Sequence, residues 1–267
     1  MIEAVTLDFG NTLVPVTGAG LGAVVGETVA AMAERLGPFD PVLVRAAWDE
    51  ERKRQFREDV PQFREVDMAQ RIARVLARLR GMPPPPAEVP WDDAVAELLS
   101  DPGEVRWTVE VYSEAFVRAM PADPAASAVV KALADRYRVA ILSNWPLAAT
   151  IDRYAEAAGW MPHLTAVVVS QRVGTIKPHA AIFAAALVAL GDPAPAHVIH
   201  VGDDWAADVM GAKGAGWRAG WLASRPADSP LPDSAPDASV VPDLVVRALV
   251  ELPAAIEALE VAGAGSG

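Results

Sequence analysis

The sequence predicts an α/β fold, a parallel sheet flanked by helices and interrupted near its start by an all-helical insertion. A short apolar run at residues 4–7 ends at Asp8 and then breaks at Gly10 and Asn11, which is typical of a buried strand followed by a turn. Residues 17–120 show helical periodicity and no convincing strand. After residue 121, short apolar runs alternate with helical patterns, and this order is typical of a parallel sheet with crossover connections.

Within the insertion, apolar side chains recur at helical spacing in successive segments. Helices are expected at residues 21–36, 41–58, 66–79, 91–99 and 105–120. The glycine and proline at 37–38 end the first of these helices. The prolines at 83–86 predict a stiff, extended connector.

The second part of the chain alternates between the two kinds of element. Strands are expected at residues 137–142, 166–169, 197–201, 217–222 and 244–246, and helices at 124–135, 147–158, 180–190, 206–214 and 250–259. The segment 224–242, rich in Pro, Asp and Ser, is expected to be a surface loop.

These patterns predict a division into domains. We expect a core domain formed by residues 1–16 and 121–261, a helical cap formed by residues 17–120, and a flexible tail at 262–267. An insertion that leaves the sheet after the first strand would place the cap over the edge where ligands bind in open α/β sheets, where it could act as a lid.

Composition excludes several classes of function. The chain has 267 residues, of which 52% are hydrophobic and 22% charged, and its formal net charge is −12. That charge argues against nucleic acid or an anionic membrane as the main partner. The absence of cysteine excludes disulfides, thiolate metal sites and a cysteine nucleophile. With no secretion signal and no apolar run approaching the roughly 18 residues of a membrane span, we expect a cytoplasmic monomer or homodimer.

Polar residues stand at the ends of four predicted strands. Each alone fits a helix cap, a turn or a solvated loop. The set comprises Asp8 and Thr12 after the first strand, Ser143 and Asn144 after the second, Lys177 after the third, and Asp203 with Asp208 after the fourth. Because the carboxyl ends of parallel strands meet at one edge of the sheet, we expect these residues to form one site.

These motifs resemble those of the haloacid-dehalogenase-like (HAD) hydrolase superfamily. The matching stretches are LDFGNTL at 7–13, ILSN at 141–144, IKP at 176–178, GDDWAAD at 202–208 and GAKGAG at 211–216. The resemblance covers nearly the whole chain. It implies a Rossmann-like core, and the helical insertion is similar to the cap of relatives that act on small molecules.

The resemblance also implies roles for individual residues. Asp8 would be the nucleophile and would form an aspartyl-phosphate intermediate. Attack on a phosphate dianion requires charge neutralisation, which Mg²⁺ would supply, held by Asp8, the backbone carbonyl of Gly10 and Asp203. Asp208, and in second place Asp204, would lie in or behind that shell.

Other residues would hold the phosphoryl group of a small phosphorylated substrate. Lys177 would pair with Asp8 and the phosphoryl oxygens, while Thr12, Ser143 and the backbone N–H of Asn144 would donate hydrogen bonds to them. The candidate substrate-binding residues are Asn11, Asn144 and Trp145. Trp145 and Trp205 are each expected to line the pocket or to pack between cap and core, the second being favoured for Trp205.

Gly10 departs from the pattern. Most phosphatases of the superfamily carry a second aspartate two residues after the nucleophile, where it protonates the leaving group and activates water. General acid–base catalysis contributes about 10²–10⁴-fold, so its loss matters. Either the substrate has a good leaving group, or another residue stands in, or the protein is not an efficient phosphatase.

The preferred interpretation is a Mg²⁺-dependent phosphatase acting on a small phosphorylated metabolite. Some sugar-1-phosphatases of the superfamily are similar in having Gly-Asn after the nucleophile. The first alternative is a metal-independent 2-haloacid dehalogenase, whose halide leaving group needs no proton, but Asp203 and Asp208 argue against it. A second alternative is a HAD-fold binding protein without catalysis, which Gly10 supports.

The cap offers few candidate substrate contacts. A phosphonate-cleaving enzyme would need a cap lysine as a Schiff base, and Lys53 is the only lysine in the predicted cap. The arginines Arg52, Arg54, Arg57 and Arg64 could reach an anionic substrate, but helices of this polarity commonly face water.

Overall fold

The computed structural model describes residues 1–82, 95 and 98–264, and it confirms the α/β fold. The described chain forms one six-stranded sheet with the order β3-β2-β1-β4-β5-β6, in which every pairing is parallel. The strands are β1 (Ala4–Leu7), β2 (Arg138–Ser143), β3 (Ala166–Val169), β4 (Val198–Gly202), β5 (Arg218–Leu222) and β6 (Leu244–Val246).

The register of the three central strands determines what meets at the sheet edge. Leu7 of β1 lies opposite Ile141 of β2 on one side and Val201 of β4 on the other. The next residue of each strand therefore emerges at the same level, and the Asp8 N–H donates to the Val201 carbonyl at 2.9 Å. The polar residues that follow these strands are consequently brought to one edge.

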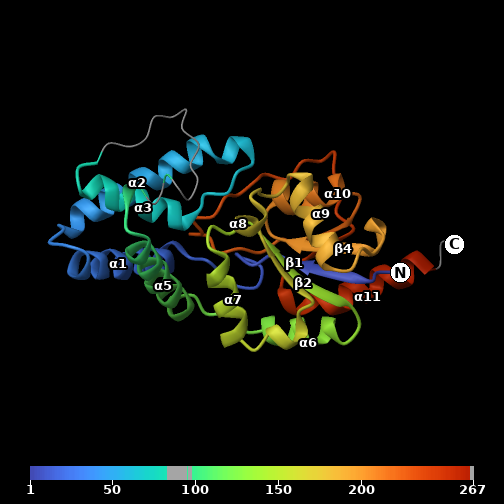
Figure 1. Cartoon of the computed structure of the whole chain (residues 1–267). Helices are drawn as coiled ribbons and strands as arrows, with labels where there is room; N and C mark the ends of the chain where they lie inside the picture. Colours follow the sequence, from blue (N-terminus) through green and yellow to red (C-terminus); the bar gives the residue numbers. More distant parts are fainter. Residues whose placement is uncertain (83–94, 96–97, 265–267) are drawn as a thin grey trace.

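Helices cover both faces of the sheet because side chains alternate between the faces along each strand. One face packs against α9 (Ala180–Ala189) and α10 (Gly211–Gly214). The other packs against α6 (Ala126–Ala134), α7 (Ala148–Ala157) and α11 (Leu252–Ala264). Figure 1 shows α9 and α10 on one side of the strands and α6 and α11 on the opposite side.

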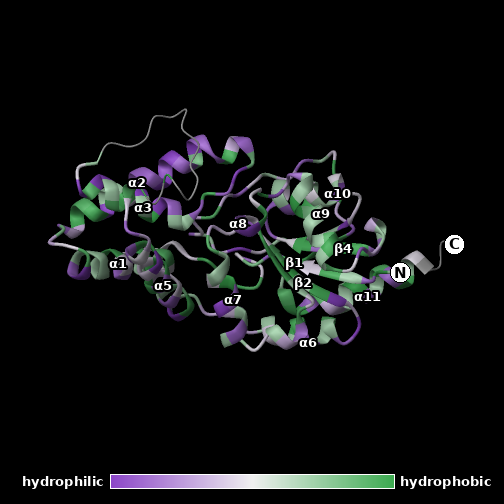
Figure 2. Cartoon of the chain, viewed as in Figure 1, coloured by the Kyte–Doolittle hydropathy of each residue, from purple (hydrophilic) through white to green (hydrophobic). Residues whose placement is uncertain are grey.

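The inserted helices gather at one end of the molecule, away from the chain termini (Figure 1). They are α1 (Gly18–Arg35), α2 (Pro41–Glu58), α3 (Met68–Leu79) and α5 (Pro102–Ala119). The side chains of Thr17, Asp40, Asp67 and Asp101 cap their amino ends. Much of α2 is hydrophilic, whereas the strands are hydrophobic (Figure 2).

The hydrophobic interior continues from the sheet into the inserted helices. Phe116 of α5 lies 6.2 Å from Phe9, 5.1 Å from Trp145 and 6.4 Å from Tyr154, measured between ring centroids. These rings belong to one cluster of buried residues that also includes side chains of α1, α2 and α3. The cap helices are therefore anchored to the sheet through apolar packing.

Several expected elements differ in detail. The segment expected as one helix at 206–214 is a π-helical turn, Trp205–Met210, followed by α10. The closing helix begins with a 3₁₀ turn, Leu249–Glu251, and α11 then runs to Ala264. Residues 262–264 of the expected tail thus form the last turn of α11. Residues 83–86 and most of the helix expected at 91–99 lie outside the described residues.

Across the described residues, no helix is both long and apolar enough to cross a bilayer.

Candidate active site

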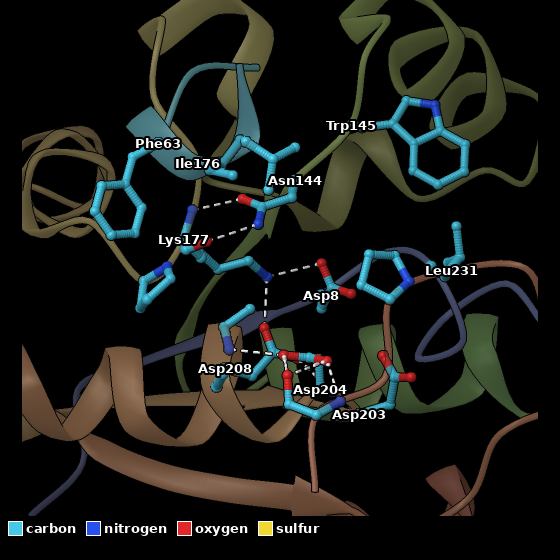
Figure 3. Close-up of a pocket in the computed structure, with 17 residues that line it drawn as sticks. Asp8, Phe63, Asn144, Trp145, Ile176, Lys177, Asp203, Asp204, Asp208 and Leu231 are labelled. Carbon is cyan, nitrogen blue, oxygen red and sulfur yellow. Dashed lines mark hydrogen bonds and ion pairs between the residues drawn. The ribbon is translucent and has the colours of Figure 1, made fainter. Parts of the chain in front are cut away.

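Three charged side chains converge at the carboxyl end of the sheet. The Lys177 Nζ atom lies 2.9 Å from Oδ1 of Asp8 and 2.6 Å from Oδ1 of Asp208. It also donates to the Leu142 carbonyl at 2.9 Å, which directs the side chain across the end of β2. All three charged residues are buried, and Figure 3 shows Lys177 between the two carboxylates.

Burial and mutual attraction set the charges of this group. Burial alone would lower the pKa of Lys177, but the carboxylates of Asp208 and Asp8 raise it above its usual value. The lysine charge holds the pKa of Asp208 well below its usual range despite burial. Burial raises the pKa of Asp8, and the nearby Asp208 adds to that rise. The lysine also lies closer to Asp208, at 2.6 Å, than to Asp8, at 2.9 Å.

A third carboxylate completes an acidic cluster. Oxygen atoms of Asp8, Asp203 and Asp208 all lie within 4.8 Å of one another. Burial and the charges of Asp208 and Asp8 raise the pKa of Asp203 to about 8. Three crowded carboxylates with hard oxygen donors fit a divalent cation such as Mg²⁺, whose charge would relieve their repulsion.

The turn after β4 carries Asp208 back to the strand end. The Asp208 Oδ2 atom accepts the backbone N–H of Asp204 at 2.9 Å. A Cβ on Gly202 would lie 2.1 Å from that same oxygen, so only glycine leaves room for the carboxylate. This close approach explains the glycine before the two aspartates and fits the π-helical turn that follows.

A buried histidine lies behind the charged group. His200 Nε2 lies 3.0 Å from Asp208 Oδ1, and Nδ1 lies 2.8 Å from the Thr6 hydroxyl. Burial and the neighbouring Lys177 charge lower the pKa of His200. Sequence reasoning missed this residue, although Thr6 and His200 are polar residues in otherwise apolar buried strands and pair in register.

Two hydroxyls in the site lack partners. The Oγ1 atom of Thr12 and the Oγ atom of Ser143 are buried without a hydrogen bond in the described chain. Buried hydroxyls are normally satisfied, so two orphans at the same sheet edge indicate that a ligand supplies the acceptors. An anion with several oxygens fits them.

The two asparagines hold the loops in place. The Asn144 side chain exchanges two hydrogen bonds with the Lys177 backbone, at 3.0 and 2.7 Å. Asn11, at φ 56°, donates to Asp203 Oδ2 at 3.2 Å and to the Ser229 hydroxyl at 3.0 Å. Its side-chain oxygen accepts the Val16 N–H at 3.1 Å. Asn11 thus links its own loop to the loops that carry Asp203 and Ser229.

The charged group borders a cavity of about 250 Å³, called here the catalytic cavity. Asn11, Thr12 and Ser143 are not among its wall residues. Its walls include Asp8, Gly10, Asn144, Trp145, Lys177, Asp203, Asp204 and Asp208, together with Val60, Phe63, Ile176, Leu231, Pro232 and Ser234. Figure 3 shows Phe63, Trp145 and Leu231 around the polar centre. The cavity is thus polar at its floor and apolar at its rim.

The loop at residues 224–242, called here the strap, lies across this edge of the sheet. Its Arg225 Nη1 atom lies 3.3 Å from Asp203 Oδ2, and the Ser234 N–H donates to Asp204 Oδ2 at 3.0 Å. A Cβ on Gly10 would lie 2.7 Å from the Leu231 Cδ1 atom. The strap therefore covers the position where a second aspartate would stand, which its loop-like composition did not reveal.

With the geometry described, comparison with known proteins identifies the family. The family model for haloacid dehalogenase-like hydrolases matches residues 2–216. The chain belongs to this family. This confirms that it is a HAD-like hydrolase, as the motifs predicted.

Individual relatives of this HAD hydrolase carry different activities. Pyrimidine 5′-nucleotidase YjjG of Escherichia coli is 31% identical over 108 residues, which are 39% of this chain and 48% of that protein. The match thus spans about half the length of that relative.

Solved structures share the fold along nearly the whole chain. A 2-haloacid dehalogenase from Pseudomonas syringae pv. Tomato has a TM-score of 0.69 at 22% identity, covering 97% of this chain and 99% of that one. A HAD phosphatase from Thermococcus onnurineus has a TM-score of 0.60 at 20% identity, covering 96% and 98%. Identities this low establish the fold alone.

The two tryptophans occupy different places in this HAD hydrolase. Trp145 lines the catalytic cavity and also packs against Phe9 and Phe116. Trp205 lies on the opposite face of the sheet, with its ring 5.0 Å from that of Trp221. The expectation that Trp205 packs between cap and core was wrong, because the turn after β4 directs it toward α9 and α10.

Most of the cap arginines are neutralised locally. Arg54 and Arg57 pair with Glu58, and Arg64 pairs with Asp59. Arg52 differs, because its guanidinium stacks 5.2 Å from the Phe56 ring and borders a second cavity. Lys53 is exposed on α2 and lines neither cavity, which argues against a Schiff-base role.

Proposed function

We propose that this HAD hydrolase is a Mg²⁺-dependent phosphatase that acts on a small phosphorylated metabolite through an aspartyl-phosphate at Asp8. The observation that carries the proposal is the acidic cluster of Asp8, Asp203 and Asp208 beside a single lysine. Lys177 and Arg225 bring two positive charges to three buried carboxylates, which leaves a surplus of negative charge, so the site favours an added divalent cation. A site for a neutral or monoanionic haloacid has no use for that surplus of negative charge.

Each residue then has a chemical task. Lys177 pairs with one oxygen of Asp8 and leaves the other free to attack phosphorus. Mg²⁺, held by Asp8, the Gly10 carbonyl and Asp203 with Asp208 behind them, would offset the repulsion between carboxylate and phosphate. The unpartnered hydroxyls of Thr12 and Ser143 would donate to the phosphoryl oxygens.

The site has no carboxylic acid at position 10 to protonate the leaving group. Gly10 brings no carboxylic acid, and the space beside it is filled by the side chains of Leu231 and Trp145. We therefore propose that the preferred substrates have leaving groups that depart without full protonation. Water attack on the intermediate would likewise proceed without an aspartate at that position.

A 2-haloacid dehalogenase remains the second candidate. The apolar surroundings of Gly10 favour it, because a halide leaving group needs no acid at that position. Asp203 opposes it, because a carboxylate whose pKa is raised to about 8 gains nothing from a metal-free haloacid pocket.

A screen of phosphorylated metabolites with Mg²⁺ and with EDTA tests the proposal. The panel includes sugar phosphates, nucleoside monophosphates and p-nitrophenyl phosphate. We expect phosphate release with Mg²⁺, none with EDTA, and weaker Mg²⁺ binding by Asp203→Ala. Chloride release from 2-chloropropionate that persists in EDTA would replace the proposal with the dehalogenase.

A further inference from the structure

A second cavity of about 340 Å³, called here the cap chamber, adjoins the catalytic cavity. The two cavities share the wall residues Val60, Asn144, Trp145, Ile176, Leu231 and Pro232. The rest of the chamber is formed largely by apolar and aromatic side chains of the cap, among them Phe56, Met68 and Tyr112. A substrate whose phosphoryl group sits at Asp8 would extend its leaving group toward this chamber.

One buried cation borders the chamber without a counter-ion. Arg71 of α3 is 4% exposed, and its Nε atom donates to Gln55 Oε1 at 2.7 Å. Within the described chain, no carboxylate lies within 4.0 Å of its guanidinium. Burial lowers its pKa to about 10, so the side chain stays charged at neutral pH. A buried charge without a partner is costly, and such a group is normally paired.

The neighbouring arginines show that pairing is the rule in this cap. Arg78 of the same helix lies 2.6 Å from Glu51, and Arg54 lies 3.0 Å from Glu58. The acid in the described chamber lining, Glu65, instead accepts hydrogen bonds from the Ser170 hydroxyl and the Val66 N–H. Two arginines border the chamber without a carboxylate within 4.0 Å in the described chain: Arg52 is half-buried and stacks on Phe56, whereas Arg71 is fully buried.

We propose that Arg71 binds a carboxylate on the leaving group of the substrate. The substrate class is then a phosphate monoester whose apolar or aromatic leaving group carries a carboxylate, with its apolar part against Phe56, Tyr112 and Trp145. A guanidinium presents parallel N–H donors that match a carboxylate. This inference rests on the proposed phosphatase function, since it takes Asp8 as the anchor of the phosphoryl group.

A binding measurement separates this inference from the catalytic proposal. The probes are 4-(phosphonomethyl)benzoate and its neutral isostere 4-(phosphonomethyl)benzamide, neither of which is hydrolysed. Isothermal titration calorimetry with Mg²⁺ compares the wild type, Arg71→Gln and Arg57→Gln. The last variant removes the same charge from an exposed position on the cap and controls for net charge.

We expect the wild type and Arg57→Gln to bind the benzoate roughly 10–100-fold more tightly than the benzamide, as a hydrogen-bonded charge contact implies. In Arg71→Gln the two affinities should converge through loss of benzoate binding alone. Equal affinities in the wild type, binding of neither probe, or a preference that survives in Arg71→Gln would each overturn the inference.

The comparison of the benzoate and benzamide probes with the wild type tests the inference even if Arg71→Gln does not fold. Turnover is followed separately with phosphate esters of 4-hydroxybenzoate and 4-hydroxybenzamide. Hydrolysis of both esters at equal efficiency would refute the inference and leave the phosphatase intact. Benzoate preference in binding without any Mg²⁺-dependent turnover would refute the phosphatase and leave the contact to Arg71 standing.

Discussion

The Nζ atom of Lys177 donates hydrogen bonds to two buried carboxylates, Asp8 at 2.9 Å and Asp208 at 2.6 Å. Within the described chain, the one cation paired with Asp203 is Arg225 at 3.3 Å, from the strap, and Asn11 donates to the same carboxylate at 3.2 Å. The pKa of Asp203 is accordingly raised to about 8, whereas that of Asp208 is lowered. Of the three carboxylates, Asp203 therefore gains the most from an added cation.

Gly10 offers the sharpest test of the missing acid. Its backbone does not have positive φ, so a side chain there is not strained by the backbone, but a Cβ would meet Leu231 Cδ1 at 2.7 Å. The test therefore uses Gly10→Asp together with Leu231→Ala. We expect the double variant to hydrolyse alkyl phosphates faster than Leu231→Ala does, by at most about 10²–10⁴-fold, with a smaller gain on p-nitrophenyl phosphate.

Steady-state rates with the two substrate classes measure that gain, with Leu231→Ala alone as the matched control. Mg²⁺ affinity, measured in both proteins, shows whether the loop has kept its shape. If affinity is retained and both substrate classes respond equally, the missing acid is not what limits this protein.

The residues that the sequence reveals are those at strand ends. Asp8 and Asp203 could be predicted to meet because they directly follow parallel strands, whose carboxyl ends lie at one edge. Lys177 lies beyond α8 (Ser170–Val173), so its place at that edge depends on the loop after this helix. His200 and Arg71 could not be assigned in this way, because their significance depends on what does or does not lie beside them in space. The sequence alone does not distinguish an arginine without a counter-ion from the other arginines of the same helix.

Among the elements, the strap connects the last strands to the site. Arg225 contacts Asp203, and it also holds the strap itself through the Leu231 and Pro232 carbonyls, at 2.9 and 3.0 Å. The Ser229 hydroxyl contacts Asn11 from the same segment. The strap thus places a positive charge beside the carboxylate that we propose as a Mg²⁺ ligand.

Removing that charge should therefore strengthen Mg²⁺ binding. We expect Arg225→Gln to bind Mg²⁺ roughly tenfold more tightly than the wild type, a difference of about 1.4 kcal/mol. Isothermal titration calorimetry at fixed ionic strength measures it. Arg172→Gln, which removes a charge from an exposed ion pair with Asp152, is the control. Unchanged or weaker binding by Arg225→Gln alone would show that the guanidinium does not compete with the cation.

Helices were the most predictable elements because their apolar spacing is long and regular. The strand positions were also predictable, since each is a short apolar run ended by polar residues. The π-helical geometry of the turn at Trp205–Met210 was not, because its residue pattern does not distinguish it from the start of an α-helix. The strap was correctly predicted to be a loop. Its contacts with the site could not be predicted, because they join residues that lie far apart in the sequence.

At the scale of the whole molecule, cap and core share one hydrophobic cluster. Phe116 of α5 contacts Phe9 and Trp145, which follow β1 and β2. The division into residues 1–16 with 121–261 and residues 17–120 remains our proposal. The shared cluster implies that the two parts unfold together.

Phe116→Ala should therefore destabilise the entire protein by about 3–5 kcal/mol, the usual cost of deleting a buried phenylalanine side chain. Calorimetry should show a single transition at a lower Tm in the variant. Val188→Ala, at a position 67% exposed on α9, should leave the Tm nearly unchanged. Two resolved transitions in the wild type would contradict a shared interior.

The covalent intermediate at Asp8 is the most direct test of the proposed mechanism. Rapid acid quench during turnover with Mg²⁺, followed by borohydride reduction and peptide mass spectrometry, detects an aspartyl-phosphate as homoserine at its position. We expect homoserine at position 8 in the wild type. Asp8→Asn should give neither homoserine nor turnover, and its near-UV circular dichroism spectrum should match that of the folded wild type. Turnover by correctly folded Asp8→Asn, or wild-type turnover with the label on another residue, would contradict the account.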